Sequence, residues 1–173
     1  MPVSKRGARP ERLKGVETLV EAYSKRGPFE PAFVRRVMAQ ACALVGAVHA
    51  SGHGHGGVSP DSLVFDKDAV LSLLPPGPPT SFDGCAAPEG VASPRGDVFS
   101  LGATAYFLLV GRTPFDDSKA KADGEFVSAS NRRTTLPLSI DLFFKKALAP
   151  DPAARFSDAA EFRAAFDKAL EPK

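Results

Sequence analysis

Apolar residues follow helical spacing along much of the chain. From Gly15 to Lys25 they fall on one side of a short predicted helix, which Gly27-Pro28 ends as a turn dipeptide should. Pro31 then stands where a helix can begin, because its missing amide hydrogen would be unpaired there anyway. The helix predicted after it has inward-facing residues at three- and four-residue steps, namely Val34, Val37, Met38, Ala41, Leu44, Val45 and Val48.

The stretch from Asp97 to Val110 is apolar nearly all round. This pattern is typical of a helix buried on most sides, so we expect it at the centre of the domain, ended by Gly111. Two short apolar pieces, Leu63 to Phe65 and Val70 to Leu74, are separated by three polar residues and predict a small hairpin.

The second half of the chain predicts further helices. Asp116 to Thr135 is polar and predicts a loop with one weak helix, and an amphipathic helix follows from Ile140 to Leu148. The last helix runs from Asp158 to Leu170, with Ser157 as its expected N-cap. We therefore expect a mainly α domain over residues 15–170, between a basic, flexible segment at 1–14 and a tail at 171–173.

Composition narrows the class of protein. The 173 residues suffice for one domain, and 43% hydrophobic with 24% charged content is typical of a soluble globular protein. A net charge of +2 is too small to indicate nucleic acid. We predict no membrane partner, because no apolar run is long enough to span a bilayer and no secretory signal is visible. Two cysteines without metal-ligand spacing favour reduced thiols in a cytoplasm.

Four segments carry a recognisable order of motifs. They are "VHASGHGHGGVSPDSLVF", "CAAPEGV", "SPRGDVFSLGATAYFLLVGRTPF" and "ALAPDPAARFS". In this order and spacing they resemble the C-terminal lobe of the protein kinase fold, of the bacterial serine/threonine type, over Gly15 to Leu170. The resemblance implies that six residues keep structural roles: His55 in the catalytic loop, Ala87, Pro88 and Glu89 at the end of the activation segment, Asp97 near the start of the central helix, and Arg155.

The chemical positions of the family hold other residues here. In such kinases the loop aspartate accepts the substrate proton, a lysine holds the γ-phosphate, and an asparagine and the Asp-Phe-Gly aspartate hold magnesium. Aligned on His55, these positions are Gly57, Ser59, Ser62 and Pro75. Glycine and proline offer no metal ligand or base on a side chain. The expectation from sequence is therefore a protein that is not an enzyme, a pseudokinase without catalytic residues, metal or cofactor.

The resemblance also implies two structural contacts. Glu89 and Arg155 are expected to form a partly buried ion pair, and Asp97 to cap the central helix and bind the loop backbone near His55. Only Met1 to Lys14 precedes the first predicted helix, so the small lobe of a kinase is expected to be absent.

Several other polar residues could form sites, but structural roles are favoured for them. The histidines could suggest a metal and Cys85 a reactive thiol, but packing and a structural thiol are favoured. A shifted register would make Asp83 the metal aspartate, and it would leave almost no activation segment. The candidate metal ligands are His49, His53 and His55. Asp61, Asp66 and Asp68 are candidate catalytic acids, and turn positions are favoured for all three.

Three functional hypotheses follow. The first is an inactive kinase-like lobe that serves as a protein-binding, regulatory or scaffold module. Its partner, or a second copy, would dock on the face that a small lobe normally covers, around Leu73, Leu74 and Pro75 to Pro79. The alternative is a divergent or partner-complemented serine/threonine kinase that retains nucleotide binding, with ATP and magnesium as cofactors. The third, a gene remnant that no longer folds, is disfavoured by the intact helical patterning.

Overall fold

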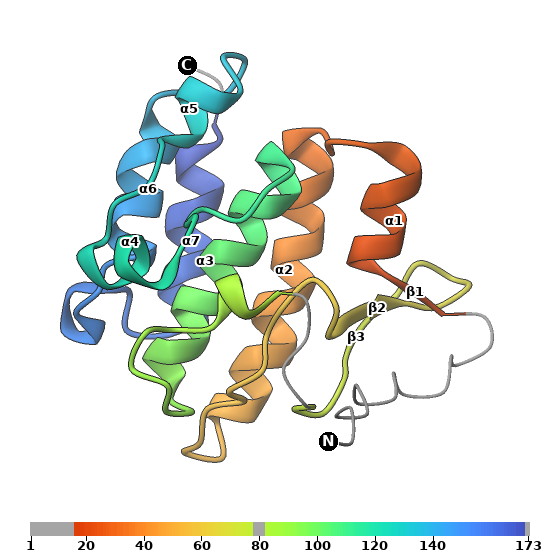
Figure 1. The fold of residues 1–173 in the computed structure, drawn as a ribbon. Helices are drawn as coiled ribbons and strands as arrows, with labels where there is room; N and C mark the ends of the chain where they lie inside the picture. Colours follow the sequence, from red (N-terminus) through yellow and green to blue (C-terminus); the bar gives the residue numbers. More distant parts are fainter. Residues whose placement is uncertain (1–15, 78–81, 172–173) are drawn as a thin grey trace, which may run out of the picture.

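The protein is described by a computed structural model that defines residues 16–77 and 82–171 (Figure 1). The fold is mainly α with one small sheet, as the sequence predicts. The α-helices are α1 (Leu19–Arg26), α2 (Pro31–His49), α3 (Pro94–Val110), α4 (Ser118–Asp123), α5 (Ala129–Arg132), α6 (Ser139–Ala147) and α7 (Ala159–Ala169). The strands are β1 (Glu17–Thr18), β2 (Leu63–Phe65) and β3 (Leu71–Leu73), and two single 3-10 turns are η1 (Asp83–Cys85) and η2 (Pro152–Ala154).

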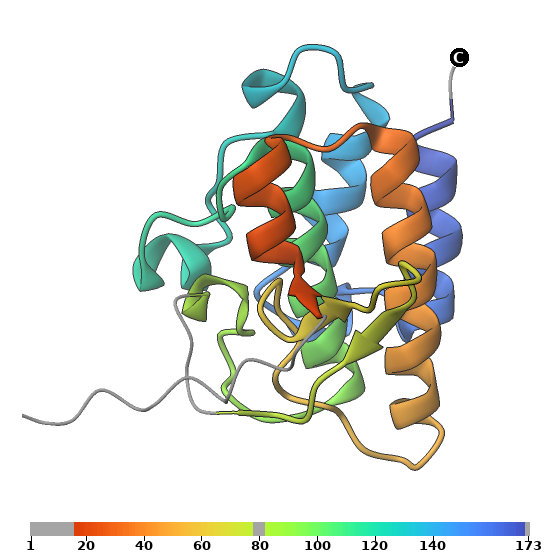
Figure 2. The same ribbon diagram turned by 90° about the vertical axis from the view of Figure 1, so that its right-hand side faces the viewer.

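Helix α3 forms the centre of the core, and every residue from Gly96 to Leu109 is buried. It begins three residues earlier than predicted, because Ser93 rather than Asp97 is its N-cap: the Ser93 side chain accepts a hydrogen bond from the Gly96 amide. Gly111 ends the helix in the left-handed conformation that favours glycine, with φ at 91°. Figures 1 and 2 both show α3 surrounded by the longer helices.

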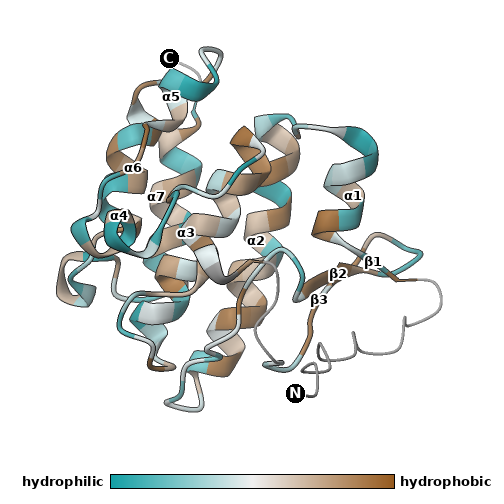
Figure 3. Cartoon of the chain, viewed as in Figure 1, coloured by the Kyte–Doolittle hydropathy of each residue, from teal (hydrophilic) through white to brown (hydrophobic). Residues whose placement is uncertain are grey.

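Helix α2 packs along α3 and α7. Pro31 occupies its first turn, and its buried positions include five of the seven residues that the spacing predicts to face inward, Val34, Val37, Met38, Ala41 and Val45. Among the described residues it is the one helix long and apolar enough to cross a membrane by length and composition. Its buried face against α3 and α7 accounts for that hydropathy (Figure 3).

The sheet has three antiparallel strands in the order β1-β2-β3. The predicted hairpin of β2 and β3 is present, with Val64 opposite Ser72. Strand β1 differs from the prediction, which is a single helix over Gly15 to Lys25. Thr18 divides the two elements: it closes the β1 pairing and forms a capping box with Glu21 at the start of α1.

The later helices differ from prediction in detail. The segment expected to contain one weak helix holds two short ones, α4 and α5. The last helix is capped by Asp158, whose side chain accepts from the amides of Ala160 and Glu161. Ser157, the predicted cap, instead donates its amide and hydroxyl to Glu161. Helices α6 and α7 close the core with phenylalanines, among them Phe144, Phe162 and Phe166.

Candidate functional site

The segment that resembles a catalytic loop is fastened to α3 by one buried carboxylate. Asp97, which has no exposed surface, accepts hydrogen bonds from the amide of His55 at 2.6 Å and from that of Gly56 at 2.8 Å. Nε2 of His49 lies 2.9 Å from the same carboxylate. The loop contact is the one that the resemblance implies for Asp97. The His49 contact was not expected, since 48 positions separate the two residues and no motif connects them.

His55 links the loop to the segment that follows β3. Its Nδ1 accepts a hydrogen bond from the amide of Gly57 at 3.2 Å. That contact leaves Nε2 to donate to the carbonyl oxygen of Leu74, 2.8 Å away. His55 is therefore a buried bridging residue in this structure.

Glycine is required where the loop meets the start of α3. A Cβ atom placed on Gly54 would lie 2.3 Å from the backbone nitrogen of Ser93, closer than any real Cβ contact.

Position 57 is less restricted. A Cβ atom placed on Gly57 would lie 3.3 Å from Cα of Pro76, which is tight but tolerable if Pro76 shifts slightly. The space beside position 57 is therefore occupied by the chain that follows Leu74.

Ser59 and Ser62, at two of the family's chemical positions, bond to each other within the loop. The amide of Ser59 donates to Oγ of Ser62 at 2.9 Å, and that hydroxyl donates to the carbonyl oxygen of Ser59 at 3.0 Å. Pro75 is exposed and carries no ligand atom on its side chain. Magnesium prefers carboxylate oxygens, so Gly57, Ser62 and Pro75 do not fit it in the family's manner. Among the described residues no group of histidine, cysteine and acidic side chains could hold a metal ion.

Arg155 and Glu89 form a bidentate ion pair, with distances of 2.7 and 2.9 Å. Three backbone carbonyls also accept from the guanidinium, those of Arg95, Ala149 and Pro150. Burial by itself would raise the pKa of Glu89, but the hydrogen bonds from Arg155 and the backbone, with the Arg155 charge, outweigh it and lower the pKa. The pair ties the segment after η1 to the loop before α7.

Ala87 and Pro88 lie in the turn that presents Glu89 to Arg155. The carbonyl of Ala87 accepts a hydrogen bond from the amide of Gly90 at 3.2 Å, and Ala87 packs against the core while Pro88 is exposed. Both residues therefore shape the turn and offer no polar side chain for chemistry.

The remaining candidates form no metal-binding group among the described residues. His53 binds the carbonyl oxygen of Ser51, so the three histidines have three different partners. Cys85 is completely buried, and burial raises the pKa of its thiol to about 12. Asp66 accepts from the amides of Asp68 and Val70 in the hairpin turn. Asp61 is half-buried, and the Asp83 side chain lies outside the described residues.

The face predicted to be apolar is partly exposed. Leu73 and Leu74 are half-buried, and Pro75, Pro76 and Gly77 are exposed, while positions 78 and 79 lie outside the described residues. Val70, in the hairpin beside them, exposes 53% of its surface. This sheet face is continuous with the loop that carries Gly57.

Comparison with known proteins places these features in a family context. No protein-family model matches the chain. It is 30% identical to the serine/threonine-protein kinase PknL of Mycobacterium tuberculosis over 82% of the chain and 42% of PknL, and 25% identical to PrkC of Bacillus subtilis over 91% of the chain and 28% of PrkC. The crystal structure of the Mycobacterium tuberculosis PknI kinase domain superposes with a TM-score of 0.76 at 23% identity, over 89% of the chain and 62% of that domain.

These relatives correct one expectation. The prediction that the protein is not an enzyme is contradicted, because the proteins it resembles are serine/threonine protein kinases, which are enzymes. The prediction gave too much weight to four side chains, whereas phosphoryl transfer depends largely on positioning and electrostatic stabilisation. The homologues of this chain are bacterial serine/threonine protein kinases, and its fold is that of a protein kinase C-terminal lobe.

Proposed function

We propose that the chain is the C-terminal lobe of a divergent serine/threonine protein kinase that binds nucleotide together with a complementary small lobe. That lobe would come from another polypeptide segment. The observation that carries this proposal is the fastening of the loop by Asp97, with its hydrogen bonds to the amides of His55 and Gly56. Positioning two substrates requires a loop that is fixed in place, and these two hydrogen bonds fix this one.

A second observation supports the same function. The ion pair of Glu89 and Arg155 fixes the segment between the loop and α3. Arg155 is buried and donates five hydrogen bonds, two to Glu89 and three to backbone carbonyls. The two anchoring contacts meet at the start of α3, because Arg155 also donates to the carbonyl oxygen of Arg95, in the same first turn as Asp97. The framework for the reaction is thus kept while the side chains within it differ.

The differing side chains define what we mean by divergent. Position 57 supplies no general base, and proton transfer to a positioned base contributes typically 10²–10⁴-fold to an enzymatic rate. The hydroxyl of Ser62 is committed to Ser59. We therefore expect slow phosphoryl transfer and nucleotide affinity that owes little to a protein-held metal.

The complementary lobe would dock on the face formed by the sheet and the exposed residues Pro75 to Gly77. Val70 and the half-buried Leu73 and Leu74 supply the apolar contact. The same exposure favours the second candidate function, a regulatory or scaffold module whose protein partner uses this face. The two functions differ in whether nucleotide is bound once the face is covered.

A chimaeric protein tests the proposal. The small lobe of PknL is joined ahead of residue 16, and transfer of the labelled γ-phosphate of ATP to a serine- and threonine-containing peptide is measured. We expect slow transfer that increases 10²–10⁴-fold in the Gly57→Asp variant, which restores a carboxylate at the base position. A folded chimaera that transfers no more phosphate than the small lobe alone, in both forms, contradicts the proposal.

A further inference from the structure

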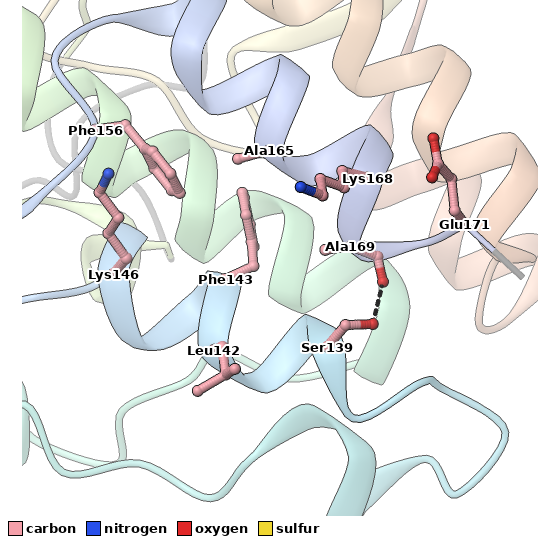
Figure 4. A pocket seen from close by; sticks show the side chains of 9 residues that line it. All are labelled: Ser139, Leu142, Phe143, Lys146, Phe156, Ala165, Lys168, Ala169 and Glu171. Atoms are coloured by element: carbon pink, nitrogen blue, oxygen red, sulfur yellow. Dashed lines mark hydrogen bonds between the residues drawn. The ribbon is translucent and has the colours of Figure 1, made fainter. Parts of the chain in front are cut away.

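A hollow lies between α6 and α7, and of the residues that line it only Phe156 belongs to one of the kinase motifs. It measures about 490 Å³, a size within the range of sites that hold small ligands or single side chains of a partner. Figure 4 shows Phe143 rising from α6 into the space between the two helices. The lining residues are Ser139, Leu142, Phe143, Lys146, Phe156, Ala165, Lys168, Ala169 and Glu171.

The walls of this groove are mainly apolar. Phe143 and Phe156 stack with their ring centroids 5.3 Å apart, and Ala165 faces them from α7. At the mouth, Leu142 exposes 74% of its surface, and Leu138, four positions earlier in the chain, exposes 77%. Two exposed leucines with this spacing extend the apolar surface beyond the groove. Surfaces of this kind mark places where another chain is bound.

The two lysines that line the groove differ in whether they already have a charged partner. Lys146 is engaged, because its ammonium contacts Glu161 at 2.9 Å and lies 4.4 Å from the centre of the Phe156 ring. Lys168 forms no ion pair with any residue that the structure describes, and in Figure 4 its side chain extends beside Phe143. Glu171, the one carboxylate in the lining, lies at the opposite end of the groove from Lys146. An occupant is therefore offered an apolar wall and an available positive charge.

We propose that this groove binds a short acidic segment of a partner protein that packs a bulky apolar side chain beside Leu142 and Ala165, above the buried rings of Phe143 and Phe156. Acidic residues beside that anchor would meet Lys168 and Lys146. The apolar anchor supplies most of the affinity in such contacts, and the charges supply orientation and choice of partner. This inference is independent of the proposed kinase function, since none of its residues belongs to the loop or to the sheet face.

The test is a selection from random dodecapeptides displayed on phage, using the whole chain as bait, followed by affinity measurement with labelled peptides. We expect enriched peptides that pair a large apolar residue with acidic ones. Their affinity should fall at least tenfold in the Lys168→Glu variant and in Leu142→Asp. It should be unchanged in Lys145→Glu, a matched control because Lys145 is exposed on α6 and does not line the groove.

Three outcomes of the peptide selection would overturn the proposal. They are enrichment of basic peptides, peptides that bind Lys168→Glu and wild type equally, and no enrichment above an empty support. Light scattering addresses a second copy as occupant: a dimer that Leu142→Asp dissociates would assign the groove to self-association and also overturn the acidic-segment proposal. Circular dichroism of each variant confirms that the fold is retained, which is expected because all three substituted side chains are exposed.

Discussion

Arg155 and Glu89, 66 positions apart in the sequence, form a bidentate ion pair. The arginine side chain is fully buried, and the glutamate side chain is 20% exposed. Removing one partner leaves the other charge buried and unpaired, which typically costs several kcal/mol. We predict that Glu89→Ala lowers the free energy of unfolding by about 3 kcal/mol, measured by urea titration. Lys119→Ala, at the exposed pair with Asp123 in α4, is the control and should cost less than about 1 kcal/mol.

The same pair predicts a pH dependence of stability. The pKa of Glu89 is lowered in the folded protein from an ordinary value of 4.5. Its contribution is therefore complete above the unfolded value, and is lost as pH falls through the lower, folded pKa. We expect the stability difference between wild type and Glu89→Gln to be constant near neutral pH and to shrink below about pH 4.5. A difference that grows in acid would contradict the assigned sign.

Two glycines should respond to alanine in opposite directions. At Gly54 a new Cβ would meet the backbone of Ser93, so the loop must move, and overpacking of this kind costs about 1–3 kcal/mol. At Gly46, inside α2, a new Cβ meets nothing within 4 Å, and helix propensity favours alanine by about 1 kcal/mol. Thermal melts of Gly54→Ala and Gly46→Ala should therefore shift down and up, respectively. Equal shifts in melting temperature would show that the loop can accommodate a methyl group between position 54 and the backbone of Ser93.

Both cysteines should be unreactive in the folded protein. Cys42 and Cys85 are buried, and burial raises the pKa of each thiol to about 12. Because the thiolate is the reactive form, we expect a thiol reagent at pH 8 to label neither residue until the chain unfolds. Labelling in urea should track the unfolding curve. Rapid labelling of native protein would place one of the thiols at the surface.

The long elements of the fold could be predicted from the sequence, because their burial leaves an apolar pattern. Helices α2, α3, α6 and α7 all show it, and they form the core. Strand β1 could not be predicted in this way, since two residues carry no periodicity and the strand depends on pairing with β2. Helix α4 buries none of its residues, so it leaves no apolar spacing to detect.

The candidate site was predictable only as far as the motifs reach. The roles of Asp97 and Arg155 came from the resemblance. The structure shows the loop contact of Asp97 and the ion pair of Arg155, but the cap of α3 is Ser93 rather than the predicted Asp97. The contact of His49 with Asp97 and that of His55 with the Leu74 carbonyl depend on how distant segments meet. Such contacts leave no mark in local sequence spacing. The groove between α6 and α7 was missed for the same reason: its residues read individually as core or surface positions.

The central claim is that this lobe binds nucleotide when a small lobe covers its sheet face, and a thermal melt of the PknL chimaera with ATP tests it most directly. A ligand at a hundred times its dissociation constant adds about 2.7 kcal/mol, or several degrees in a protein of this size. The account predicts such a rise with ATP, present without magnesium and larger than with inorganic triphosphate. A chimaera that melts cooperatively and does not respond to ATP would contradict it.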